Sequence, residues 1–117
     1  MNVDTSIGVS VSARLLANYF CTLVNQVYKI LPMRETEQKS LSKYVWRLEA
    51  ELLGCNELFP SVKEDSYFAS LLGILHYLSE SVDDCQPQKV KQLVFEAIGL
   101  CEKLKDRYAA ADSEGVL

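Results

Sequence analysis

Residues 61–82 read SVKEDSYFASLLGILHYLSESV, and this stretch decides the fold class. Its large apolar residues recur three or four positions apart, which is the spacing that places side chains on one face of an α-helix. The residues of this apolar seam are Phe68, Leu71, Leu75, Leu78 and Val82. Ser61 and Glu64 have the spacing of a capping box, which marks the start of a helix. We therefore expect a helix from about Ser61 to a turn at residues 83–85.

A seam with the same spacing runs through the N-terminal part of the chain. It consists of Leu16, Phe20, Leu23, Val27 and Ile30. Ser10 or Ser12 can cap this helix by accepting a hydrogen bond from a free backbone N–H. Pro32 is expected to end the helix near Leu31, because the residue before a proline is pushed out of the α region. Residues 1–10 are expected to form a loose leader.

Two further seams lie in the middle and at the end of the chain. They are Leu41, Val45, Leu48 and Leu52, and then Val90, Val94, Ala97, Cys101, Leu104 and Tyr108. The first of these helices is expected over residues 36–53, followed by Gly54 as a left-handed C-terminal residue. The second is expected to begin at Pro87, where the missing N–H of proline costs nothing. Residues 110–117 are expected to fray.

The four seams fit one small domain. The chain has 117 residues, near the commonest domain size, with only 3 prolines and 5 glycines. The connections between seams are short, so consecutive helices are expected to be antiparallel neighbours. The sequence therefore predicts an all-α fold, an antiparallel up-down-up-down four-helix bundle that spans residues 1–117 as a single domain.

Composition argues against several classes of function. A net charge of −4 has the wrong sign for a generic nucleic-acid binder. No segment approaches the roughly 18 apolar residues of a membrane span, and the N-terminus lacks the basic start of a signal peptide, so we expect a cytoplasmic protein. With His76 as the single histidine and no C-x-x-C pair, we expect no metal, no cofactor and no enzyme activity. Small core residues in a reducing compartment are the expected role of Cys21, Cys55, Cys85 and Cys101.

Several helices carry more apolar surface than a bundle seam requires. The surplus residues considered as an interface are Tyr28, Trp46, Ala50, Leu53, Leu93 and Leu100. One interpretation is that these wide stripes only fill a thick core. The other is that an outer face contacts a protein partner or a second copy of the chain, with Trp46 and Tyr28 as its anchors. We favour the second interpretation and expect a homodimer.

A basic stripe gives an alternative binding function. Lys39, Lys43 and Arg47 recur every four residues on one face of the helix expected over residues 36–53. Such a stripe could follow a phosphate backbone or contact an acidic protein. Nearby glutamates reduce the net positive charge of this region, and a helix face exposed to solvent explains the same pattern.

His76 raises a third possibility. A four-helix bundle with one histidine on a helix resembles the histidine-phosphotransfer domains, and Leu78 matches the apolar residue two places after the histidine of that family. The family has lysine and glycine at the next two positions, where this chain has Ser79 and Glu80. A carboxylate one turn from the ring would repel a phosphoryl group, so a boundary histidine paired with Glu80 is the favoured interpretation.

Residues 18–35 and 51–55 carry a wider resemblance. The runs NYF and VYKILPMRE, followed by ELLGC, look like small uncharacterised all-helical proteins of Gram-positive gut bacteria and their mobile elements. The resemblance implies no catalytic residues and an accessory role such as binding a host protein. We expect a non-catalytic interaction protein, with a nucleic-acid-associated protein as the alternative and a phosphotransfer protein third.

Overall fold

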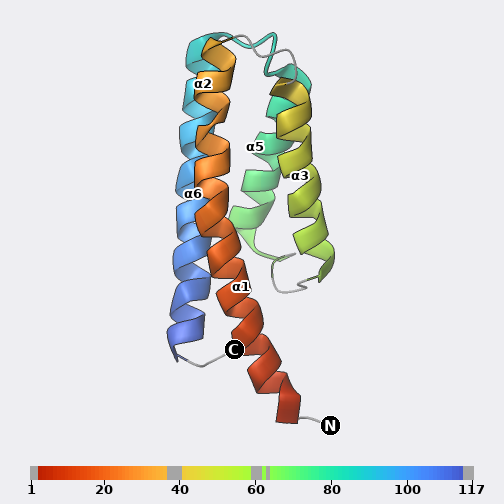
Figure 1. Cartoon of the computed structure of the whole chain (residues 1–117), viewed down its shortest axis with the longest axis vertical. Coiled ribbons are helices and arrows are strands. Elements are labelled where there is room, and N and C mark those ends of the chain that lie inside the picture. Colours follow the sequence, from red (N-terminus) through yellow and green to blue (C-terminus); the bar gives the residue numbers. More distant parts are fainter. Residues whose placement is uncertain (1–2, 37–40, 59–61, 63, 115–117) are drawn as a thin grey trace.

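The computed structural model describes residues 3–36, 41–58, 62 and 64–114. Its elements are α1 (Val3–Tyr28), α2 (Ile30–Glu35), α3 (Leu41–Leu58), α5 (Ser66–Ser81) and α6 (Pro87–Glu114). They form an all-α, antiparallel up-down-up-down four-helix bundle in which α2 continues α1 (Figure 1). The bundle measures 52 × 21 × 20 Å, so its length is set by α1 and α6.

The helices pack as two pairs that share one core. α1 lies along α6, α3 lies along α5, and α5 closes the bundle against α6 (Figure 1). Every residue of the four seams read from the sequence is buried. Three aromatic rings meet in the core near the start of α5, with the Phe20 centroid 6.5 Å from that of Phe68 and 6.1 Å from that of Tyr108. Burial of these seams removes their apolar side chains from water and holds the bundle together.

The two ends of the chain are more helical than the sequence predicts. α1 begins at Val3, so the loose leader expected over residues 1–10 is wrong for residues 3–10. α6 continues to Glu114, so the fraying expected over residues 110–117 is wrong for residues 110–114. Adding a residue to an existing helix forms one hydrogen bond for each residue ordered, and a single glycine such as Gly8 costs only about 1 kcal/mol.

Pro32 does not end the helical path near Leu31, because α2 follows α1 after the single residue Lys29 and continues to Glu35. Lys29 keeps the right-handed helical conformation, with φ −62° and ψ −16°, and α2 starts one residue later. The Lys29 N–H donates to the Asn25 carbonyl and the Met33 N–H donates to the Lys29 carbonyl, both at 3.2 Å, so helical hydrogen bonds continue on both sides of Pro32, which has no N–H to donate. Thr36, expected to begin the next helix, instead ends α2, and its hydroxyl donates to the Pro32 carbonyl at 3.0 Å.

The helix ends in the middle of the chain also differ from the prediction. Gly54 lies inside α3, which continues to Leu58, so it does not terminate the helix. α5 begins after Asp65, whose carboxylate accepts a hydrogen bond from the Tyr67 N–H at 2.9 Å. α5 is therefore capped by Asp65 and begins later than the sequence predicts, while the capping box expected at Ser61 and Glu64 cannot be followed because Ser61 lies outside the described residues. Pro87 begins α6, as the sequence predicts.

Candidate interaction surfaces

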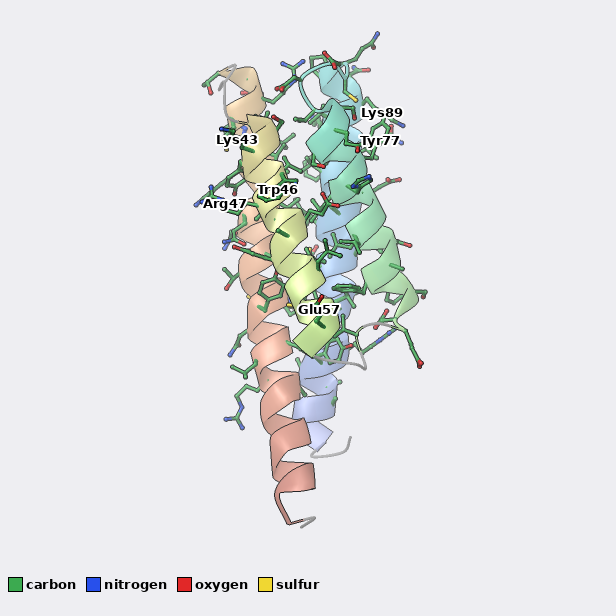
Figure 2. All side chains as sticks on the ribbon, turned by 90° about the vertical axis from the view of Figure 1, so that its right-hand side faces the viewer. Lys43, Trp46, Arg47, Glu57, Tyr77 and Lys89 are labelled. Carbon is green, nitrogen blue, oxygen red and sulfur yellow. The ribbon has the colours of Figure 1, made fainter. Side chains whose placement is uncertain are left out.

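The outer face of α3 carries the most exposed large apolar side chain of the described residues. Trp46 is 62% exposed, although it lies on the same helix as the buried Val45 and Leu48. We call the outward-facing set of Lys43, Trp46, Arg47, Ala50, Leu53, Gly54 and Glu57 the α3 stripe. In Figure 2, Lys43, Trp46 and Arg47 lie toward the N-terminal end of α3 and Glu57 lies toward the other end. The stripe therefore combines an aromatic anchor with charges of opposite sign at its two ends.

A shallow hollow lies beside Trp46. It has a volume of about 600 Å³ and is lined by Met33, Lys43, Tyr44, Trp46 and Arg47. The Tyr44 hydroxyl donates to the Gln26 carbonyl of α1 at 2.6 Å, and the Arg47 guanidinium lies 5.9 Å from the Tyr44 ring. Burial raises the pKa of Tyr44, while Arg47 partly opposes this shift. One wall of the hollow is thus fixed by the bundle, while Trp46 stays open to solvent.

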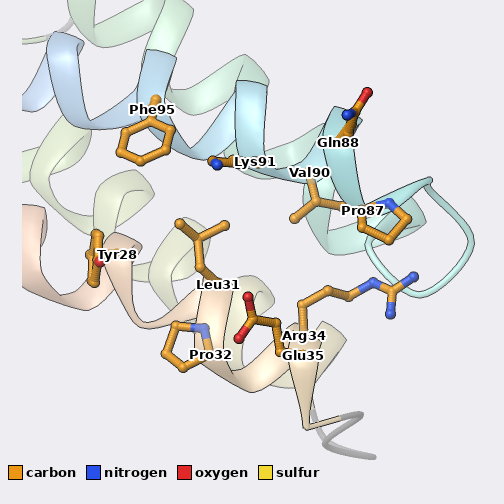
Figure 3. Close-up of a pocket in the computed structure, with 10 residues that line it drawn as sticks. All are labelled: Tyr28, Leu31, Pro32, Arg34, Glu35, Pro87, Gln88, Val90, Lys91 and Phe95. Atoms are coloured by element: carbon orange, nitrogen blue, oxygen red, sulfur yellow. The ribbon is translucent and has the colours of Figure 1, made fainter.

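Tyr28 lines a different groove. Its ring is 53% exposed and faces a groove of about 460 Å³ between the α1–α2 segment and α6 (Figure 3). Phe95 of α6 lines the same groove and is 48% exposed. The sequence predicts a single outer face around Trp46 and Tyr28, and in the structure the two rings line separate hollows. α1 packs along α6, so its exposed ring adjoins that helix rather than the outer face of α3.

Phe95 was missed in the sequence because it stands beside the seam residue Val94. A large aromatic residue off the seam of an amphipathic helix is the signal that could have found it. Leu93 and Leu100, which were named as interface candidates, are half-buried and pack against the core. Ala50 and Leu53 are exposed on the α3 stripe, where the sequence prediction placed them beside Trp46.

His76 joins α5 to α3 through a carboxylate. Its Nδ1 lies 2.8 Å from Glu49 Oε2, and its Nε2 lies 3.4 Å from Glu80. The Ser79 hydroxyl donates to the other Glu49 oxygen at 3.1 Å. The hydrogen bond to Glu49 and the charges of both glutamates raise the pKa of His76. The pairing with Glu80 agrees with the sequence interpretation, while Glu49, 27 residues away, was not foreseen.

Both ring nitrogens of His76 face carboxylates, and this geometry repels an incoming phosphoryl group. Burial disfavours the thiolate form of two of the cysteines. Burial raises the pKa of Cys101 to about 12 and also raises the pKa of the half-buried Cys55. Cys21 is exposed, so its expected place in the core is wrong.

Two cations of the expected basic stripe lie side by side in the α3 stripe. Lys43 and Arg47 are exposed and line the hollow beside Trp46, while Lys39 lies outside the described residues. Within the described part of the chain, no group of three His, Cys, Asp or Glu side chains could hold a metal ion. Among the helices that the structure describes, none is both long enough and apolar enough to span a membrane.

A comparison of the chain with protein-family models, with curated proteins and with solved structures found no match in any of the three. The function is therefore inferred from the surfaces of the bundle alone.

Proposed function

We propose that this protein is a non-catalytic interaction protein that acts through the α3 stripe, and that it associates with a second copy of itself. The observation that carries the proposal is the exposure of Trp46 on a helix whose opposite face is buried in the bundle. Tryptophan is enriched at the centres of protein interfaces because it offers a large, rigid contact area. Leu53, 45% exposed, lies two turns further along the same face and extends the apolar contact.

The expected energy of this contact is sufficient for a reversible complex. Covering the exposed part of Trp46 would remove on the order of 100–150 Å² from water and stabilise a complex by about 2–4 kcal/mol, before the costs of association. In a symmetric dimer this gain occurs twice, once for each copy. The two contacts together supply about 4–8 kcal/mol before the costs of association, so a weak dimer with a dissociation constant between roughly micromolar and millimolar is expected.

Analytical ultracentrifugation over a range of concentrations tests the proposal. The wild type is expected to convert from monomer to dimer, and Trp46→Ala is expected to weaken the dimer at least about tenfold. Phe95→Ala is the matched control, because it removes an exposed aromatic ring from a different groove. A wild type that stays monomeric at high concentration would contradict self-association, and a loss confined to Phe95→Ala would place the contact at the Tyr28–Phe95 groove instead.

A second candidate function is binding to single-stranded nucleic acid. The specific observation that favours it is the shared hollow of Lys43, Arg47 and Trp46, since cations beside an exposed aromatic ring can hold phosphates and stack a base. Fluorescence anisotropy with a labelled oligonucleotide at low salt tests this function. Salt-sensitive binding that is lost in the Lys43→Ala/Arg47→Ala variant would support it, and no binding by the wild type would exclude it.

Three further expectations from the sequence stay predictions. Phosphotransfer through His76 is tested by incubation with a donor kinase and detection of phosphohistidine. Location in the cytoplasm is tested by fractionation of the host cell. An origin in a mobile element is tested by the neighbouring genes.

A further inference from the structure

The residues of the α3 stripe are arranged symmetrically about Ala50. Lys43, Ala50 and Glu57 are spaced seven residues apart, so they lie almost in line along the outer face of the helix. A cation stands at one end of this line, an anion at the other, and a small residue at its midpoint. Neither Lys43 nor Glu57 takes part in an ion pair with another described residue. Both charges are therefore available to a partner.

Gly54 is a second, independent feature of the same face. It lies inside α3, where glycine costs about 1 kcal/mol relative to alanine. A Cβ placed on Gly54 would meet no neighbouring atom of the described chain within 4 Å, so packing inside one copy does not demand a glycine there. Gly54 follows Ala50 by four residues, and Trp46 precedes Ala50 by the same number. Gly54, which has no side chain, and Trp46, which has a large one, are therefore equally far along the helix from Ala50.

We propose that α3 packs against α3 of a second copy in antiparallel orientation, about a twofold axis at Ala50. In this arrangement, a residue that precedes Ala50 on one helix meets the residue that follows Ala50 by the same number on the other. Trp46 then covers the partner's Gly54, and Lys43 meets the partner's Glu57. Ala50 contacts the partner's Ala50 at the axis, where a small side chain allows the helices to approach closely. This register rests on the proposed self-association and specifies its geometry.

Other arrangements of the same two helices are poorer. A parallel pair would place Lys43 against the partner's Lys43 and Glu57 against the partner's Glu57, so that like charges meet at both ends. An antiparallel pair centred on Arg47 would place two guanidinium groups together at the axis. Only the register about Ala50 pairs the cation with the anion and the tryptophan with the glycine. One helix face is a small interface beside the roughly 800 Å² per partner of a standard complex, so a weak, reversible dimer is expected.

A charge exchange between Lys43 and Glu57 tests the register. Lys43→Glu alone and Glu57→Lys alone each place two like-charge contacts across the axis, and each is expected to weaken the homodimer about tenfold at low salt. An equimolar mixture of the two variants is expected to form a heterodimer of wild-type affinity, because both contacts then pair opposite charges. Sedimentation equilibrium at low and high salt measures all three dissociation constants.

Gly54 provides a test in which two effects have opposite signs. Gly54→Ala is expected to raise the melting temperature of the monomer, since alanine is the better helix former and the added Cβ meets open space. The same change is expected to weaken the dimer severalfold, and Gly54→Leu is expected to weaken it further. Gly73→Ala on α5 is the matched control, because a Cβ there also meets nothing within 4 Å. It is expected to raise the melting temperature with no change in dimerisation.

The outcomes separate the register from the self-association on which it rests. A wild type that forms no dimer overturns both. A wild type that dimerises, while the charge variants bind as tightly as it does and the mixture gains nothing, overturns the register and leaves self-association standing. Recovery in the mixture, together with the opposite effects of Gly54→Ala, establishes the antiparallel pairing.

Discussion

The two faces of α3 differ in what they require from the rest of the molecule. The inner face is buried by the other helices of the same chain, and its residues are Leu41, Val45, Leu48 and Leu52. The outer face holds an aromatic ring and opposite charges that no described part of the chain covers. The inner face thus explains why the helix is folded, and the outer face is the part free to act on something else. Changes on the two faces should therefore affect different measurements.

The largest expected effect is on the inner face. Leu52→Ala should destabilise the fold by about 3 kcal/mol, because it removes buried methyl groups and leaves a cavity. Trp46→Ala, on the outer face, should change the free energy of unfolding by less than about 0.5 kcal/mol. Urea unfolding followed by circular dichroism, at a concentration where the protein is monomeric, gives both values. A large loss of monomer stability in Trp46→Ala would mean that this ring supports the fold rather than an interface.

The next effect concerns the polar anchor at the start of α5. The Asp65 carboxylate is only 2% exposed, caps α5 and forms an ion pair with Arg107 of α6, whose guanidinium lies 4.8 Å from the Tyr67 ring. Asp65→Ala should cost about 2 kcal/mol, since it removes both the cap and the ion pair. Asp65→Asn should cost about 1 kcal/mol, because the amide oxygen can still cap the helix. Asp106→Asn, an exposed carboxylate on α6, serves as the control with no expected change.

Equal losses in the two Asp65 variants would show that the charge, rather than the cap, carries the stability. Neither variant should affect dimerisation, because Asp65 lies outside the α3 stripe. A change in the dimer dissociation constant would extend the interface beyond α3.

The smallest expected effect comes from His76, which joins α3 to α5 at the solvent boundary. Its pKa in the folded state is raised above the ordinary value of 6.5, mainly by the hydrogen bond to Glu49. The stabilisation of the fold by protonated His76 is therefore fully present below pH 6.5 and is lost as the pH rises through the raised pKa of His76. The difference in urea midpoint between the wild type and His76→Gln should shrink over that rise. Midpoints that differ by a constant amount at every pH would mean that the charge of His76 contributes nothing.

Several features could be predicted from the sequence alone. Residues such as Phe20, Leu48, Leu75 and Leu104 recur at helical spacing, and all of them are buried. Apolar periodicity identifies them because each helix must hide one continuous stripe from water, whatever partner covers it. The exposure of Trp46 could be predicted for the same reason, since it lies off the stripe of its own helix.

Other features were decided by tertiary structure. Helix ends such as Thr36 and Gly54 depend on energies of about 1 kcal/mol, which packing readily overrides. The pairing of His76 with Glu49, and the grouping of Tyr28 with Phe95 rather than with Trp46, depend on which helices become neighbours.

The sequence by itself determined four helices, their order and their buried faces, because those properties follow from the spacing of apolar residues along the chain. Only the tertiary structure decided which apolar residues beside the seam of α6 stay outside, because Leu93 and Phe95 differ in exposure through their neighbours rather than through their own hydrophobicity.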